Sequence, residues 1–218
     1  FERLNTGGVE LSHQEVRNCL YQGPLNQLLF RLSQNEKYRK AWGLPPFSAQ
    51  EIKATPDALL ENKFYLQMED MELVLRFFAL RHVKHYQRGM QGFLDLYMLR
   101  SRVFTDADIS LLEGLFNRVI DIASSVYEDK LFRPYSIRLQ DWGQRPQKAY
   151  ADAVLVALSQ VLDAGETLVA KREKILDETR RLFVGDDAGI LTGRGNTKRD
   201  VESRIETVRK MYDRVLAT

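Results

Sequence analysis

Hydrophobic residues recur along most of the chain at the spacing of an α-helix. The clearest case runs from Glu69 to Gln87, where apolar side chains return every three or four residues on one face. The first turn of this segment is acidic, which suits the positive end of a helix dipole. We therefore predict a core helix over residues 69–87, with its apolar face built from Met71, Val74, Leu75, Phe78 and Val83.

The same spacing predicts further helices on both sides of this segment. Capping signals precede three of them: a capping box from Ser12 to Glu15, and hydroxyl–acid pairs at residues 105–108 and 197–200. No convincing alternation of period two occurs, so the predicted fold class is all-α, a helical bundle. The other predicted helices lie within residues 13–20, 25–32, 93–99, 105–126, 150–162, 167–183 and 197–215.

Proline and glycine mark the interruptions between the helices. Gly23-Pro24 ends one helix and starts the next, and residues 43–67 and 131–147 have weak periodicity. Four glycines in residues 185–196 predict an exposed loop. We predict a helical bundle domain over residues 1–184, the glycine-rich loop over 185–196 and a C-terminal helix over 197–218. That last helix is the one we expect to dock elsewhere, through the heptad-like stripe Val201, Ile205, Val208, Tyr212 and Val215.

Composition narrows the class of protein but not its activity. Of 218 residues, 44% are hydrophobic and 28% are charged, which is ordinary for a soluble globular protein. The lone Cys19 rules out an internal disulfide and suits a reducing cytoplasm, and its place among apolar residues predicts a buried thiol. No apolar run is long enough to span a membrane. The net charge of +2 is too small to argue for a polyanionic partner, so that case depends on where the charges lie.

One segment concentrates positive charge. Between Arg76 and Arg102 the only acid is Asp95, while His82, His85, Tyr86 and Tyr97 lie among the cations. Such a row could neutralise backbone phosphates and bind DNA. The alternative is a solvated helix face whose balancing acids come from other helices. Arg76 lies in an apolar run and could instead be buried against an acid. The candidate DNA-binding residues are Arg81, Lys84, Arg88, Arg100 and Arg102, of which we expect the first three to share one helix face.

The opening segment has a turn that leads into a helix N-terminus. Gly7 and Gly8 follow Asn5 and Thr6, which is typical turn chemistry. A helix N-terminus favours anions, and the guanidinium of Arg3 could hold a phosphate in a bidentate manner. The alternative is a purely local turn in which Arg3 pairs with a nearby acid. The candidate nucleotide-binding or gating residues are Arg3, Asn5, Thr6, Gly7 and Gly8.

Residues 1–18 also resemble a hallmark motif of a bacterial protein family. The run Phe1-Glu-Arg-Leu-Asn-Thr-Gly-Gly, with Leu11 and Gln14-Glu-Val-Arg-Asn18, is similar to the second hallmark of the N-terminal half of GmrSD-type, modification-dependent restriction enzymes. That family joins a ParB/sulfiredoxin-like nucleotide-hydrolysing domain to a helical domain. Looser likeness continues, in order, at residues 73–80, 93–98 and 132–135.

The resemblance implies a helical portion of a defence-type, nucleotide-dependent restriction protein. The family's first hallmark, an Asp-Gly-Gln-Gln-Arg run, does not occur here, so the resemblance implies that the ParB-like domain lies upstream as a partner of this chain. It also implies that NTP, with Mg²⁺, belongs to the full-length protein and that no cofactor belongs to this chain. We expect the chain alone to be inactive, with no catalytic residue of its own, although the parent would be an NTPase or nuclease.

Other candidate chemistry is weaker. Aromatic and basic residues in an irregular stretch could stack nucleic-acid bases, or Trp142 could simply plug an end of the bundle. Three scattered histidines do not make a zinc site or an HNH-type nuclease centre, so we predict no metal ligands. The competing hypothesis is a non-enzymatic helical interaction module. The residues of the irregular stretch are Arg133, Arg138, Asp141, Trp142, Arg145 and Lys148.

Overall fold

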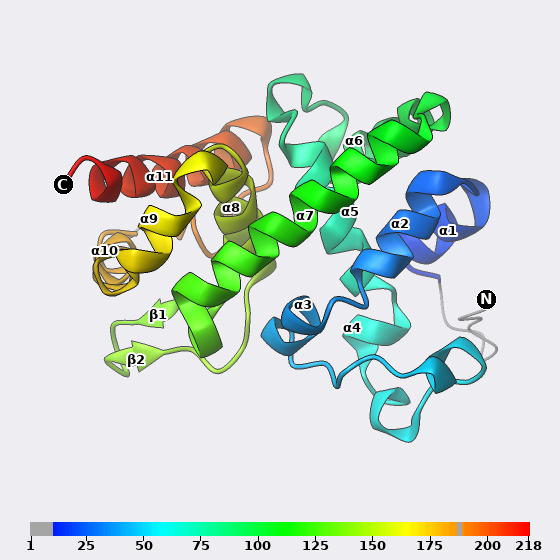
Figure 1. The fold of residues 1–218 in the computed structure, drawn as a ribbon, viewed down its shortest axis with the longest axis horizontal. Helices are drawn as coiled ribbons and strands as arrows, with labels where there is room; N and C mark the ends of the chain where they lie inside the picture. The colour runs from blue at the N-terminus through cyan, green and yellow to red at the C-terminus, as the bar shows by residue number, and fades with distance from the viewer. Residues whose placement is uncertain (1–10, 187–188) are drawn as a thin grey trace.

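The computed structural model describes residues 11–186 and 189–218, and over these ranges the fold is all-α (Figure 1). The α-helices are α1 (His13–Leu20), α2 (Pro24–Leu32), α3 (Glu36–Ala41), α4 (Lys63–Leu66), α5 (Glu69–Leu80), α6 (Gly89–Arg100), α7 (Asp106–Tyr127), α8 (Lys148–Ser159), α9 (Gly165–Ala170), α10 (Arg172–Val184) and α11 (Lys198–Leu216). Short 3-10 helices are η1 (Ala49–Ile52), η2 (Asp57–Leu59), η3 (Val83–His85), η4 (Ser101–Val103), η5 (Glu128–Lys130) and η6 (Leu162–Ala164). The two short strands are β1 (Tyr135–Ser136) and β2 (Asp141–Trp142).

Helix α7 is the axis of the molecule. It begins at a capping box between Thr105 and Asp108, as predicted, and runs for 22 residues. Helices α1–α4 lie on one side of it in Figure 1, and α8–α11 lie on the other. Contacts to α2, α3, α8, α9 and α10 surround it. The bundle is therefore built around one long helix.

The hydrophobic core is continuous from α2 to α11. At its centre the ring of Phe116 lies 5.6 Å from the rings of both Tyr38 and Phe77, and 6.2 Å from that of Phe78. A smaller cluster of Leu44, Leu59 and Tyr65 lies under the connection between α3 and α4. These contacts place helices from both halves of the chain on a shared apolar interior.

Helix α5 is shorter than predicted, because it ends at Leu80 rather than Gln87. Residues 82–86 continue in tight turns, with the 3-10 helix η3, and the ring of Tyr86 is buried. Its hydroxyl donates to the carbonyl of Asn196 at 2.8 Å. The prediction that Arg81, Lys84 and Arg88 share one helix face is therefore wrong, since they lie on the connection between α5 and α6.

Helix α11 packs against other helices of the same chain. Its heptad stripe, from Val201 to Val215, is buried, and its main neighbour is α8. The hydroxyls of Tyr212 and Tyr127 lie 2.9 Å apart in the interior. The prediction that this helix docks elsewhere is wrong, because its apolar stripe completes the core of the same chain. Its predicted cap is confirmed by the bonds between Thr197 and Asp200.

Two connecting segments also differ from expectation. The glycine-rich loop is not exposed throughout, because Leu191 is buried and the carboxylate of Asp186 accepts from the amides of Ile190 and Leu191. The predicted helix over residues 167–183 is divided at Lys171 into α9 and α10. The first difference arises from the bonds of Asp186, which apolar periodicity does not report.

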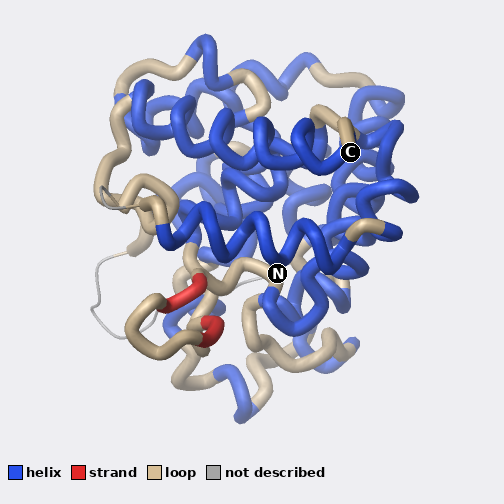
Figure 2. The backbone as a smooth tube through the Cα atoms, turned by 90° about the vertical axis from the view of Figure 1, so that its left-hand side faces the viewer, coloured by secondary structure: helices blue, strands red, loops and turns tan. Residues whose placement is uncertain are grey.

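The irregular stretch after α7 contains a small hairpin, which Figure 2 shows at the edge of the helical body. Strands β1 and β2 are antiparallel, with Tyr135 opposite Trp142. The two rings pack edge to face at 5.7 Å. Trp142 therefore closes this hairpin against Tyr135.

None of the described helices has, by itself, both the length and the apolar character to cross a membrane. Helix α8 followed by residues 162–170 meets that test by length and composition only, as a pair bent by 85°.

Candidate nucleic-acid interface and the polar network behind it

The capping box at the start of α1 is present as predicted. The hydroxyl of Ser12 accepts from the amide of Glu15 at 3.1 Å, and the Glu15 carboxylate accepts from the amide of Ser12 at 2.8 Å. The Ser12 hydroxyl also donates to the carbonyl of Gln67 at 2.7 Å. The cap therefore does two things, because it starts α1 and attaches it to the segment before α5.

Helix α1 turns its polar face inward. Gln14, Glu15 and Arg17 are buried, whereas Leu20 is 70% exposed. Cys19 is exposed, so the prediction of a buried thiol is wrong. The physical reason is that the partners of Arg17 lie on neighbouring helices, and satisfying a buried guanidinium outweighs covering an aliphatic side chain.

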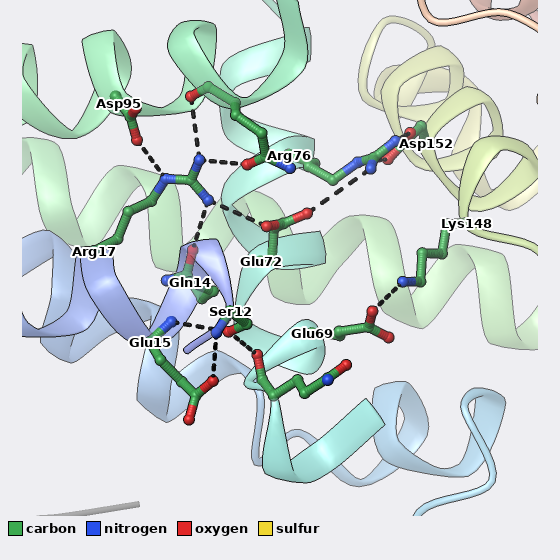
Figure 3. Close-up of polar contacts among 12 residues, drawn as sticks. Ser12, Gln14, Glu15, Arg17, Glu69, Glu72, Arg76, Asp95, Lys148 and Asp152 are labelled. Atoms are coloured by element: carbon green, nitrogen blue, oxygen red, sulfur yellow. Dashed lines mark hydrogen bonds and ion pairs between the residues drawn. The ribbon is translucent and has the colours of Figure 1, made fainter. Parts of the chain in front are cut away.

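Arg17 joins α1 to α5 and α6 (Figure 3). Its Nε donates to Asp95 at 2.7 Å and its Nη1 donates to Glu72 at 3.1 Å. Its Nη2 donates to the carbonyl of Gln91 at 3.1 Å. Charge-assisted bonds of this kind are stronger than neutral ones and need the planar fork of arginine. One buried side chain thus fixes the relative positions of three helices.

The network continues from α5 to α8 through Arg76. This guanidinium pairs with Asp152 and lies 3.9 Å from Glu72, the acid that Arg17 also contacts. Burial lowers the pKa of Arg76, but Asp152 and Glu72 outweigh that effect and the net direction is upward. Burial raises the pKa of Asp152, against the opposing influence of Arg76. The prediction that Arg76 is buried against an acid is confirmed.

We use the name basic band for the five cations predicted to contact DNA. All five side chains are exposed, and none forms an ion pair with any residue in the described ranges. The single acid within this segment, Asp95, is held by Arg17 and pairs with none of them. The members of the basic band are Arg81, Lys84 and Arg88 between α5 and α6, and Arg100 and Arg102 at the end of α6 and in η4.

Aromatic contacts bring the two parts of the basic band together. The ring of His82 lies 6.1 Å from that of Tyr97, which in turn lies 6.1 Å from Phe104. Burial raises the pKa of Tyr97 to about 12, with Arg81 opposing it, and partial desolvation lowers the pKa of Arg81. His82, the neighbour of Arg81 in the chain, therefore lies beside Tyr97, one helical turn before Arg100. From there the basic band follows α6 back to Arg88, a length of about 18 Å for this 12-residue helix.

Of the other predicted site residues, only those of the irregular stretch lie within the described ranges. Arg3, Asn5, Thr6, Gly7 and Gly8 lie outside the described residues. In the hairpin, the Asp141 carboxylate accepts from the amide of Trp142, and at the start of α8 Lys148 pairs with Glu69 at 2.5 Å. Across residues 11–186 and 189–218, no three His, Cys, Asp or Glu side chains form a group that could hold a metal ion.

The sequence analysis predicted neither the contacts of Arg17 nor the identity of the acid that pairs with Arg76. For that acid one signal was available: Asp152 stands alone in the run Ala149-Tyr-Ala-Asp-Ala-Val-Leu-Val-Ala157, just as Arg76 stands alone in its own apolar run. Opposite single charges in two core helices predict a pair, since an unpaired buried charge is costly.

Comparisons with protein-family models, with curated proteins and with solved structures each find no match to this chain.

Proposed function

We propose that this chain is the DNA-contacting helical portion of a nucleotide-dependent, defence-type restriction protein of the GmrSD kind. The observation that carries the proposal is the basic band, in which five exposed cations have no ionic partner among the described residues. Such cations are free to replace the counterions of a phosphate backbone, which is the main source of sequence-independent affinity for DNA. Contacts of this kind position a protein on DNA without reading its sequence.

Ion pairs on α10 and α11 provide a comparison for the basic band. On α10 and α11, five basic residues pair with acids, most of them one turn away on the same helix: Arg180 with Asp177, Arg181 with Glu178, Arg209 with Asp213, Lys210 with Glu206, and Arg214 with Glu178. These stretches of α10 and α11 therefore carry counter-charges for most of their cations. The basic band groups five cations without such counter-charges among the described residues, which favours an external anionic partner over a solvated face.

The polar network supports the nucleotide-dependent part of the proposal. The resemblance implies that residues 1–18 complete or gate a nucleotide site whose catalytic residues, NTP and Mg²⁺ belong to an upstream domain. Arg17 attaches the end of that motif to Asp95 and Gln91 on α6, the helix that the basic band follows. A displacement of α1 would thus be passed directly to the DNA-contacting helix. On its own, the chain is proposed to bind DNA and to hydrolyse no nucleotide.

A salt titration of DNA affinity tests the proposal. The triple variant Arg81→Gln/Lys84→Gln/Arg88→Gln should bind a short labelled duplex more weakly than the wild type. The slope of log K against log salt should flatten by about 0.9 for each phosphate that the variant no longer neutralises. The loss of affinity should be similar for duplexes of unrelated sequence, and the stability of the variant should change by less than about 0.5 kcal/mol, since the three side chains are exposed.

The matched control removes the same charge from the paired surface. Arg181→Gln/Arg209→Gln/Lys210→Gln lowers the net charge equally but changes cations that have acidic partners. We expect its salt slope to stay close to that of the wild type. Equal slopes for the wild type and the basic-band variant would overturn the proposal and leave these residues as a solvated surface.

A helical interaction module remains the second candidate function, and one observation favours it. The outer face of α1 leaves Leu11 45%, Val16 39% and Leu20 70% exposed. In the native protein, an Asp-Gly-Gln-Gln-Arg run before Phe1 would favour the restriction protein, and its absence would favour the interaction module.

A further inference from the structure

A second basic segment, remote in sequence, lies directly against the basic band. The hydroxyl of Tyr86 donates to the carbonyl of Asn196 at 2.8 Å, and the Nζ of Lys198 donates to the carbonyl of Lys84 at 2.5 Å. Figure 1 shows the start of α11 beside the connection between α5 and α6. Residues 194–199 and 81–88 therefore form neighbouring parts of one surface.

Two of the three cations of this segment lack an ion pair within the described ranges, like those of the basic band. Arg194 and Arg199 are exposed and have no ion pair with any residue of the described part of the chain. Lys198 has one loose ion pair, 3.8 Å from Glu202. The nearby carboxylate of Asp200 accepts from the amide and hydroxyl of Thr197 as the cap of α11.

These cations occupy positions that do not help their helices. Lys198 and Arg199 are the first two residues of α11, where the helix dipole disfavours positive charge. Arg88 precedes α6 with a left-handed φ of 62°, and its side chain makes no capping bond. Helix stability therefore does not explain why the cations are placed here, whereas an anionic ligand would.

The backbone of this segment is also anchored to α8 and α11. The guanidinium of Arg204 is buried, and it donates to the carbonyls of Gly195 and Asp200. Gly193 has a φ of 91°, and a Cβ at this position would lie only 2.9 Å from the Cβ of Ala149, so the loop packs closely on α8. A preorganised set of cations loses less entropy on binding than a mobile one.

We propose that Arg194, Lys198 and Arg199 form a second row of phosphate contacts, continuous with the basic band, for the backbone of a nucleic acid. This inference rests on the proposed function and extends it, because it assigns the ligand two rows of contacts from two distant parts of the chain. The bridging bonds from Tyr86 and Lys198 set the relative position of the two rows.

The test compares salt slopes of duplex binding for three sets of variants of the 218-residue chain, using a fluorescent DNA duplex. Arg194→Gln/Arg199→Gln should flatten the slope by about 0.9 for each phosphate left without its cation, as should the triple variant of the basic band. Lys40→Gln/Lys53→Gln is the control, because both lysines are exposed and without ion pairs in the described ranges but lie on α3 and after η1. Its slope should match that of the wild type.

The outcomes separate the inference from the proposed function. A flattened slope for Arg194→Gln/Arg199→Gln and an unchanged control would support the second row. A wild-type slope for this double variant, with a flattened slope for the basic-band variant, would overturn the inference alone. Wild-type slopes for both would overturn both proposals. Equal changes in the double variant and the lysine control would show a general charge effect, and binding to anionic lipid vesicles without duplex binding would indicate another partner; either result would overturn the inference.

Discussion

Two groups of arginines in this protein behave in opposite ways. Arg17, Arg39 and Arg76 are buried, and each has an acidic partner: Glu72 and Asp95, Glu51, and Asp152. Their counterparts in the basic band are exposed and have no such partner among the described residues. The buried group holds helices together, because a buried charge must be compensated. The exposed group contributes little to the fold and is available to a ligand.

The largest effect should come from breaking the buried pair between Arg76 and Asp152. We expect Arg76→Leu to lower the free energy of unfolding by about 3–5 kcal/mol, since it leaves a buried carboxylate without its partner. Urea denaturation measures this directly. The double variant Arg76→Leu/Asp152→Leu should lose less than the single one, because both charges are removed. Arg172→Leu, at an exposed ion pair with Glu128, should cost no more than about 1 kcal/mol.

A smaller effect should follow from replacing the fork of Arg17 while keeping its charge. Arg17→Lys retains one ionic partner but cannot serve Asp95, Glu72 and Gln91 together, so we expect a loss of about 2–3 kcal/mol. Hydrogen exchange should also quicken in α1. Arg31→Lys is the matched control, because Arg31 pairs with Glu113 at the surface and should lose under about 1 kcal/mol. Equal losses of stability in the two variants would contradict the structural role of Arg17.

The cap of α1 gives a third and more modest test. Ser12→Ala removes the hydroxyl that accepts from Glu15 and donates to Gln67, and should cost about 1 kcal/mol in a denaturant melt. Ser12→Asn keeps a capping acceptor and should recover part of that loss. A neutral result for Ser12→Ala would mean that this cap does not limit the stability of the protein.

The smallest effect concerns the pH dependence of stability at the basic band. The pKa of His82 is lowered by burial, and further by Arg81 and His85. Above the ordinary histidine pKa of 6.5, His82 is neutral in both the folded and the unfolded chain, and its contribution to stability is fully present. As the pH falls from 6.5 through the lowered pKa of the folded state, that contribution is lost, because the unfolded chain binds the proton more readily. His82→Gln should therefore make thermal unfolding less sensitive to acid. If the melting temperature of the variant falls with acid as steeply as that of the wild type, His82 does not contribute.

Sequence reasoning succeeded where the determinants are local. The caps at Ser12, Thr105 and Thr197 depend on residues three positions apart, so a single sequence contains all the necessary information. Helix α7 was predictable because its apolar spacing repeats over 22 residues. The burial of Arg76 could be inferred from the apolar residues around it.

Prediction from the sequence failed where residues far apart in the chain determine the local structure. The end of α5 depends on Tyr86 and its bond to Asn196, which is 110 residues away. The inward face of α1 depends on acids of α5 and α6, so a rule that places apolar residues inside reversed its orientation. The contact between residues 81–88 and 194–199 could not be predicted for the same reason, since no local sequence pattern links the two segments.

The exposed position of Cys19 makes α1 accessible to site-specific spectroscopy. Cys19 is the single thiol of the whole chain, and it lies two residues after Arg17 on a helix whose polar face is buried. A maleimide fluorophore or nitroxide spin label would therefore attach at one known point without any prior substitution. Its anisotropy or line shape would follow α1 while DNA is added, and would show in real time whether that helix stays docked on α5 and α6.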